Sequence, residues 1–234
     1  MNKEDIYNKL EEKMLGFADY IDVPTTPTSE ELVAIPRTGV IVGKQIGQDM
    51  RRYTGDAILV RWTVLQKLRA AAKLLGEYSS DYRLEVVYGY RAPDIQQRLF
   101  DEHRERLKAA VPEADLDAAT HKLIAVPEVA GHPTGGAVDI RLMIESEAAD
   151  MGTDIWDFVP DSFTFSPFIS KEAWANRQLL RRVMTTAGFA PFDGEWWHFS
   201  YGDREWARYY SEPAAIYEQI APPSRNSSSL IREA

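Results

Sequence analysis

The sequence predicts an α+β fold, with an antiparallel sheet of about four or five strands and helices packed on one side and around the edges. Residues 84–90 and 137–144 are rich in β-branched and aromatic side chains, which is typical of strands. Residues 57–78 and 171–187 carry apolar side chains at helical spacing. The chain has 234 residues, 44% of them hydrophobic, which is enough for one sizeable core. We therefore expect a single domain.

The first half of the chain is predicted to be mainly helical. An apolar stripe within residues 3–20 indicates a helix that docks on the domain, and prolines break regular structure after it. Residues 57–78 are expected to form a long, buried core helix. After the strand at 84–90, helices are predicted over 96–107 and 112–123.

In the second half, strands and helices alternate around one long loop. The strand at 137–144 is followed by residues 151–169, which lack a clean period and predict an ordered loop that lines a site. A helix is expected over 171–187, and Asp-Gly near the middle of 189–201 indicates an antiparallel hairpin. Residues 206–220 predict a covering helix interrupted by a proline.

The composition excludes several classes of site and partner. The chain has no cysteine, so disulfides and thiolate metal sites are excluded and any metal must be held by His and carboxylate groups. A net charge of -9 argues against a nucleic-acid partner. The charged N-terminus lacks the apolar stretch of a secretory signal or membrane anchor, so we expect a cytoplasmic protein with no membrane partner. Such a protein would meet small soluble peptides, not assembled cell wall.

Two histidines and an aspartate predict a metal site. His132 and Asp139 provide a nitrogen and an oxygen ligand, and Gly135-Gly136 between them allow a tight turn with unusual dihedrals. The candidate third ligand, His198, lies far downstream in an aromatic, β-prone run. Three protein ligands with one open position are what a catalytic zinc needs.

Other interpretations of these histidines stay open. A structural zinc would be closed by a fourth ligand, for which His103 and His121 are the remaining histidines, or the histidines would pack in the core without a metal. His103 and His121 lie on helical stretches among charged residues, so we expect both at the surface.

The two metal motifs resemble those of the zinc D-alanyl-D-alanine dipeptidases of the VanX type and the related D,D-carboxypeptidases. The family pattern is Ser-x-His-x-x-Gly-x-Ala-x-Asp, followed by Glu-x-x-His. His132, Gly135, Ala137 and Asp139 fall on the first motif, and Glu195 with His198 falls on the second. Ala130 stands where the family has its serine.

Two further segments carry the resemblance, which spans roughly residues 55–210. Residues 88–93, Tyr-Gly-Tyr-Arg-Ala-Pro, are similar to the family's Tyr-Arg-Pro segment, whose arginine lies beside the zinc. Residues 151–157, Met-Gly-Thr-Asp-Ile-Trp-Asp, are similar to a family Met-Gly-Thr segment but contain one more residue before the last Asp. The resemblance implies the fold of Hedgehog and D,D-peptidases.

We assign the catalytic roles to Glu195 and Arg91. A carboxylate beside a metal-bound water is suited to take its proton and pass it to the leaving amine, so Glu195 is the expected general base and then acid. Arg91 is the expected donor to the oxyanion. A solvated hairpin position for Glu195, and a surface salt bridge to Asp94 or Glu102 for Arg91, are the structural alternatives.

Substrate contacts are expected from the loop and from the aromatic residues. Asp154 or Asp157 would reach the substrate ammonium as a buried carboxylate, with a plain loop and a helix-capping Asp as the alternative. Trp197 and Tyr90 are expected to wall the pocket.

The predicted function is zinc-dependent hydrolysis of D-alanyl-D-alanine, or a similar short D-amino-acid dipeptide, by a metal-activated water. A zinc D,D-carboxypeptidase or other amidase acting on a peptidoglycan-type peptide is the first alternative, and a non-catalytic zinc-containing binding module is the second. Within the domain, residues 1–54 would form an N-terminal helix and connecting segment packed on it, 55–220 the zinc peptidase core, and 221–234 a mobile tail.

Overall fold

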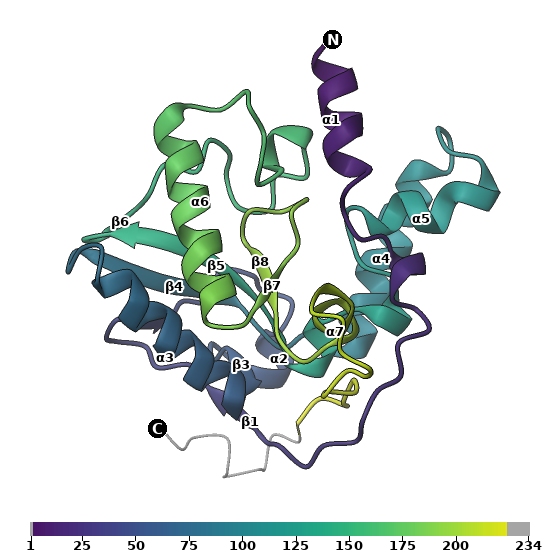
Figure 1. Cartoon of the computed structure of the whole chain (residues 1–234). Coiled ribbons are helices and arrows are strands. Elements are labelled where there is room, and N and C mark those ends of the chain that lie inside the picture. Colours follow the sequence, from purple (N-terminus) through teal and green to yellow (C-terminus); the bar gives the residue numbers. More distant parts are fainter. Residues whose placement is uncertain (1, 224–234) are drawn as a thin grey trace.

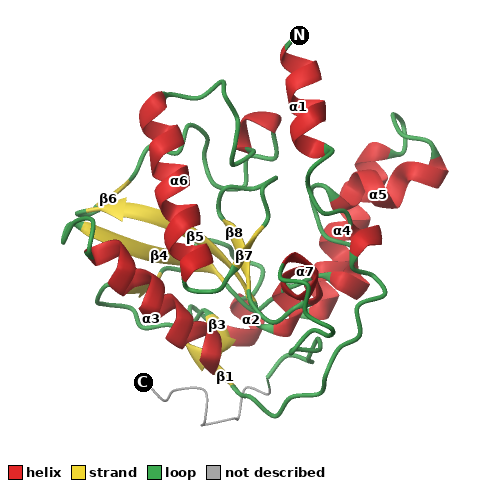
Figure 2. Ribbon diagram, in the orientation of Figure 1, coloured by secondary structure: helices red, strands yellow, loops and turns green. Residues whose placement is uncertain are grey.

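The computed structural model describes residues 2–223 (Figure 1). The predicted α+β class is confirmed: a mixed sheet lies at the centre, with helices around it (Figure 2). Most of the tail predicted at 221–234 lies outside the described residues. Across the described range, no helix has both the length and the apolar character needed to span a bilayer.

The central sheet has six strands, one more than the upper prediction, in the order β2-β4-β5-β8-β7, with β6 paired to β5. Every pairing is antiparallel except that of β2 with β4 at the edge, which is parallel. A separate two-stranded antiparallel sheet joins β1 to β3. The strands are β1 Leu32–Ala34, β2 Ile41–Gly43, β3 Leu59–Arg61, β4 Tyr82–Tyr88, β5 Ala137–Ile144, β6 Glu147–Ala148, β7 Ala190–Pro191 and β8 His198–Ser200.

Helices surround the sheet, with α3 and α6 packed together over one part of it and α4 and α5 grouped at another (Figure 1). Several have clear local causes: Ser170 caps α6 by accepting from the Ala173 N–H, and Pro93 opens α4 at a position where a missing N–H costs nothing. The helices are α1 Lys3–Glu11, α2 Arg51–Thr54, α3 Trp62–Gly76, α4 Pro93–Leu107, α5 Leu116–His121, α6 Lys171–Thr186 and α7 Arg204–Tyr209.

The long helix predicted over 57–78 was wrong at its start. Leu59–Arg61 forms β3 and pairs with β1, so the helix α3 begins only at Trp62. The backbone N–H of Arg61 also donates to the carbonyl of Gly135, which ties this strand to the glycine turn. The N-terminal helix likewise stops at Glu11, and α7 stops at Tyr209, ahead of Pro213.

The alternation of β5 separates the core from the site. Val138, Ile140 and Leu142 are fully buried in the main apolar cluster, together with side chains of α3 and α6. Because successive strand residues point to opposite faces, Asp139 and Arg141 point to the other face. Burying each of the three apolar side chains contributes about 1.5–3 kcal/mol, so the strand that carries Asp139 is firmly held.

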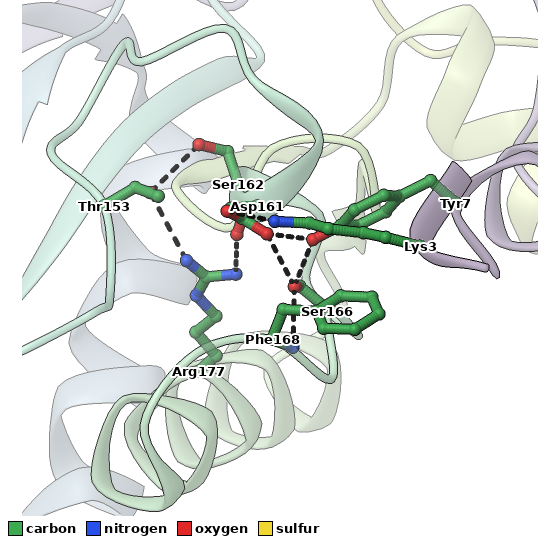
Figure 3. Close-up of polar contacts among 8 residues, drawn as sticks. All are labelled: Lys3, Tyr7, Thr153, Asp161, Ser162, Ser166, Phe168 and Arg177. Atoms are coloured by element: carbon green, nitrogen blue, oxygen red, sulfur yellow. Dashed lines mark hydrogen bonds and ion pairs between the residues drawn. The ribbon is translucent and has the colours of Figure 1, made fainter.

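The loop between β6 and α6 is held by a buried arginine. Arg177, on α6, is 1% exposed and donates to the backbone carbonyls of Met151, Asp161 and Phe163 at 2.7–2.8 Å. Figure 3 shows its contacts with Asp161 and with the hydroxyl of Thr153. On the far side of this loop, Lys3 of α1 forms a 3.0 Å ion pair with Asp161. The N-terminal helix and α6 thus clamp the same loop from two sides.

Replacing Arg177 with methionine should destabilise the fold. The side chain keeps its bulk, but one buried and two part-buried carbonyls lose their donor, and breaking such a network costs about 3 kcal/mol or more. Urea unfolding measures the free energy of unfolding directly. Exposed Arg182, on the same helix, provides the control, since Arg182→Met should change it by less than about 0.5 kcal/mol. Equal effects of the two substitutions would contradict the clamp.

Candidate active site and metal centre

Two strands and one short 3-10 helix bring the predicted ligands together. Asp139 on β5 lies directly opposite His198, the first residue of β8, in the antiparallel register. His132 lies in a short 3-10 helix, His132–Thr134, immediately before the glycine turn that leads into β5. Nitrogen or oxygen atoms of the three side chains all lie within 4.8 Å of one another. The spacing predicted from the sequence therefore converges on one point.

The distances fit a tetrahedral metal ion. His132 Nε2 lies 3.4 Å and His198 Nδ1 lies 3.0 Å from Asp139 Oδ1. Two ligand atoms each about 2.1 Å from a tetrahedral centre are separated by about 3.4 Å, so only small shifts are needed to coordinate zinc. Two imidazoles and one carboxylate also match the ligand types that zinc takes in catalytic sites.

The orientation of His132 is fixed by its backbone partners. Its Nδ1 lies 2.8 Å from the Gly89 carbonyl, which can only accept, so Nδ1 carries the proton and the Nε2 lone pair faces Asp139. The following turn requires glycine twice. Gly135 has φ of 75°, and a Cβ at Gly136 would lie 2.4 Å from the Tyr201 carbonyl oxygen.

Trp156 supports Asp139 from the loop. Its indole Nε1–H donates to Asp139 Oδ2 at 2.9 Å, which leaves Oδ1 facing the two histidines. Trp156 adopts a left-handed backbone with φ of 66°, a conformation that a bulky residue rarely takes and that turns the ring inward. The loop therefore contributes an aromatic donor to the site.

Replacing Trp156 with phenylalanine should weaken metal binding. The variant keeps the aromatic ring but loses the hydrogen bond to Asp139. Loss of such a supporting bond typically lowers metal affinity by about 10- to 100-fold. Chelator competition gives the zinc dissociation constant. Trp174→Phe, which changes an exposed tryptophan on α6, should leave it unchanged. If the zinc dissociation constant were the same for the wild type and Trp156→Phe, Trp156 would have no part in metal binding.

Burial and mutual contact set the charges of the ligands. Burial lowers the pKa of His132 to about 4, so its imidazole is neutral and able to ligate near pH 7. Burial opposes the ionisation of Asp139, but His132 and His198 beside it hold its pKa well below the usual range. Burial would also lower the pKa of His198, yet the hydrogen bond and charge of Asp139 raise it to about 9. The cluster thus combines a neutral His132 ring with an ion pair between Asp139 and His198.

Glu195 lies in the turn between β7 and β8, not on the final strand as predicted. Its carbonyl accepts from the His198 N–H at 3.1 Å, so the turn places the carboxylate and the ligand side by side. Glu195 is half-buried and lines the same cavity as the three ligands. Loss of hydration raises its pKa to about 8, while the charges of His198 and Arg91 act in the opposite direction.

Arg91 follows β4 and lines the cavity as well. Its Nη1 donates to Gln96 Oε1 at 2.8 Å, and its guanidinium carbon lies 4.6 Å from the centre of the Tyr88 ring. Gln96 is fixed in turn, because its amide donates to the Ala125 carbonyl at 2.7 Å. The salt bridge expected as an alternative is absent from the ion pairs of the described residues, where Asp94 pairs with Arg52 and Glu102 with Arg98.

One cavity contains most of the predicted site and several residues that the motifs did not indicate. Glu195, Arg91, Trp197 and the three ligands all line it. The lining also includes residues from six other parts of the chain, none of which was predicted as a site residue: Tyr20, Gln96, His121, Trp156, Phe158, Phe192 and Glu205. The family serine position, Ala130, lines it too, so the missing hydroxyl does fall at the site.

The expectation that His121 lies at the surface was wrong. It is 7% exposed, and its Nε2 lies 2.6 Å from the hydroxyl of Tyr20, which packs on α5 from the N-terminal segment. Its Nδ1 accepts from the Val126 N–H, and burial lowers its pKa to about 4. His121 is therefore a neutral residue of the cavity wall, while His103 is half-buried and does not line the cavity.

Three predicted substrate contacts lie away from the cavity. Tyr90 packs in a second apolar cluster and donates to the Ile220 carbonyl at 2.8 Å. Asp154 and Asp157 are exposed, not buried, and neither lines the cavity that holds the ligands. Both carboxylates therefore keep their hydration, while Trp156 of the same loop donates to Asp139.

Comparison with known proteins places the chain in a family. A family model described as D-ala-D-ala dipeptidase matches residues 38–216. A D-alanyl-D-alanine dipeptidase of Synechocystis is 29% identical over 235 residues, covering 86% of this chain and 94% of that protein. One from Escherichia coli is 30% identical over 161 residues, covering 68% of this chain and 72% of the relative.

Solved structures are more distant. A mutant of the vancomycin resistance D,D-pentapeptidase VanY in complex with Zn(II) is 18% identical, with a TM-score of 0.41, over 85% of this chain and 96% of that one. The LD-carboxypeptidase LdcB is also 18% identical, with a TM-score of 0.45, over 78% and 75%. The sequence matches are decisive by themselves, because the family model spans more than half of the chain. The chain therefore belongs to the D-Ala-D-Ala dipeptidase family.

Proposed function

We propose that this protein hydrolyses D-alanyl-D-alanine to two molecules of D-alanine, with a zinc ion held by His132, Asp139 and His198. The convergence of two imidazoles and one carboxylate within 4.8 Å, beside Glu195 and Arg91 in one cavity, is the observation that carries the proposal. Membership of the family supports the substrate. Zinc, when bound, acts as a Lewis acid that polarises the scissile carbonyl and lowers the pKa of a coordinated water.

The roles of the chain's own residues follow from their positions. Glu195 accepts a proton from the attacking water and then delivers it to the nitrogen of the leaving D-alanine as the C–N bond breaks. Burial raises the pKa of Glu195 to about 8, which lies within reach of neutral pH and suits a group that must both accept and donate a proton. Trp197, almost fully buried, forms a rigid wall that keeps bulk water from this proton transfer.

Arg91 provides fixed positive charge where negative charge develops. Stacked on Tyr88 and hydrogen-bonded to Gln96, its guanidinium is held in place before the substrate arrives. As water adds to the carbonyl, its N–H groups donate to the oxygen that becomes negative. A donor held in this way needs no reorganisation at the moment of reaction, which is the main source of such stabilisation.

A panel of four substrates tests the function. The purified, zinc-loaded protein is given D-Ala-D-Ala, L-Ala-L-Ala, N-acetyl-D-Ala-D-Ala and a pentapeptide ending in D-Ala-D-Ala, and D-alanine release is followed by a stereospecific assay. We expect D-Ala-D-Ala to be cleaved fastest. Faster cleavage of the acetylated or longer peptide would favour a D,D-carboxypeptidase. No cleavage of any peptide, with zinc bound, would favour a non-catalytic zinc module.

A further inference from the structure

The substrate of a dipeptidase brings an ammonium group close to the reacting centre. In D-Ala-D-Ala the ammonium nitrogen is two covalent bonds, each about 1.5 Å long, from the scissile carbonyl carbon. A cation held in a partly closed cavity needs an opposite charge or several acceptors to replace its lost hydration. A dipeptidase of this kind therefore needs an acidic group beside its metal ligands.

The cavity contains one carboxylate without an assigned task. Among the described residues, three carboxylates line it: Asp139, Glu195 and Glu205. Asp139 is engaged with both histidines and Trp156, and Glu195 is the proton-transfer group. Glu205, in the first turn of α7, is half-buried and has no hydrogen-bond or ion-pair partner in the described part of the chain.

Glu205 lines the same cavity as Glu195 and His198, so its charge acts on both groups. Its negative charge helps to raise the pKa of both Glu195 and His198, and it also acts on Tyr20 across the cavity. Burial raises the pKa of Glu205 itself to about 7, and the nearby carboxylates of Asp203 and Asp193 act in the same direction, against His198. A cation bound beside Glu205 would stabilise its ionised carboxylate.

We propose that Glu205 binds the α-ammonium of the substrate's N-terminal residue and thereby selects free dipeptides over blocked or longer peptides. This inference rests on the proposed function. It gives to Glu205 the task that the sequence suggested for Asp154 or Asp157, both of which lie outside the cavity. The selecting charge then comes from the helix that follows the metal motif, not from the loop that precedes α6.

A purely structural role for Glu205 predicts a different result. A carboxylate in the first turn of a helix interacts favourably with the free N–H groups there. In α7, however, Asp203 already caps the helix by accepting from the Trp206 N–H at 2.8 Å. If Glu205 served only the helix, its loss would change stability and the cleavage of all substrates together.

The test compares D-Ala-D-Ala with propionyl-D-alanine, which lacks only the ammonium group. For Glu205→Gln we expect kcat/KM for D-Ala-D-Ala to fall about 10- to 100-fold, mainly through KM, because the ammonium loses its counter-charge. The value for propionyl-D-alanine should stay the same, so the preference for the free amine collapses. Glu212→Gln makes the same charge change at an exposed position outside the cavity and should keep the wild-type preference.

Binding gives a second measurement that does not depend on turnover. In a Glu195→Gln background, calorimetric titration of D-Ala-D-Ala should show a Kd about 10- to 100-fold higher when Glu205→Gln is added. The inference alone is overturned if wild-type protein prefers the free amine and Glu205→Gln keeps that preference, or if Asp157→Asn loses it instead. An equal fall in kcat/KM for both substrates would mean that Glu205 acts only by stabilising the helix α7. A wild-type protein that neither cleaves nor binds D-Ala-D-Ala would end the proposed function and this inference together.

Discussion

Glu195→Gln is expected to lower kcat for D-Ala-D-Ala by about 10²- to 10⁴-fold while leaving the zinc content at one ion per chain. Glutamine has the shape of glutamate but cannot accept the proton of the attacking water, and positioned acid–base groups contribute rate factors of this size. Glu195 is not among the three clustered ligands, so metal binding does not depend on it.

Single-turnover rates together with metal analysis measure both quantities on one preparation. Thermal unfolding serves as the control, since within residues 2–223 no hydrogen bond to the Glu195 side chain is present and its backbone bonds are unaffected by the change. A Glu195→Gln protein that turned over at the wild-type rate would mean that another group accepts the proton. Glu205, the other free carboxylate of the cavity, would then be the first to test.

His132→Ala is expected to abolish stoichiometric zinc binding and, with it, all measurable hydrolysis. Removal of one of three protein ligands leaves only Asp139 and His198, and the deleted ring also gives up its bond to the Gly89 carbonyl. The ring is 6% exposed, so the substitution opens a small space as well. Metal analysis after dialysis against dilute zinc gives the occupancy directly.

His103→Ala is the matched control for this change. His103 is half-buried, its Nδ1 lies 2.9 Å from the Leu99 carbonyl, and it does not line the cavity. We expect this variant to keep one zinc per chain and wild-type turnover. If His132→Ala kept its zinc, or if His103→Ala lost it, the ligand set would be wrong.

The clustering of His132, Asp139 and His198 could be predicted from the sequence because the geometry that brings them together is mostly local. His132 and Asp139 are joined by a short turn whose glycines are required by a positive φ at Gly135 and a close approach at Gly136. The strand β5 that carries Asp139 has the bounds that its alternation predicted, 137–144. His198 is brought in by a hairpin, also a short-range structure.

The residues that were missed depend on contacts between distant segments. His121 is buried because Tyr20, a hundred residues earlier, packs against it, and no pattern within α5 records that contact. Leu59–Arg61 has helical spacing with the residues after it, but pairing with β1 made it a strand. Tertiary pairing overrides local propensity in such short segments.

The substrate contacts failed for a related reason. In this loop Trp156, which has a positive φ, contacts Asp139, while Asp154 and Asp157 are exposed to solvent. Glu205, to which we assign the ammonium contact, lines the cavity from a different element, α7. A glutamate in the first turn of a helix looks the same in sequence whether or not it faces a site.

The metal position is the most direct test of the central claim that His132, Asp139 and His198 hold a single catalytic zinc. A crystal of the zinc-loaded protein, measured at the zinc absorption edge, should show one anomalous peak about 2.0–2.2 Å from His132 Nε2, Asp139 Oδ1 and His198 Nδ1. We expect the fourth position to face Glu195 and to carry no protein ligand. A peak elsewhere, or a fourth side chain such as that of His121 or Glu205 closing the coordination, would contradict the account.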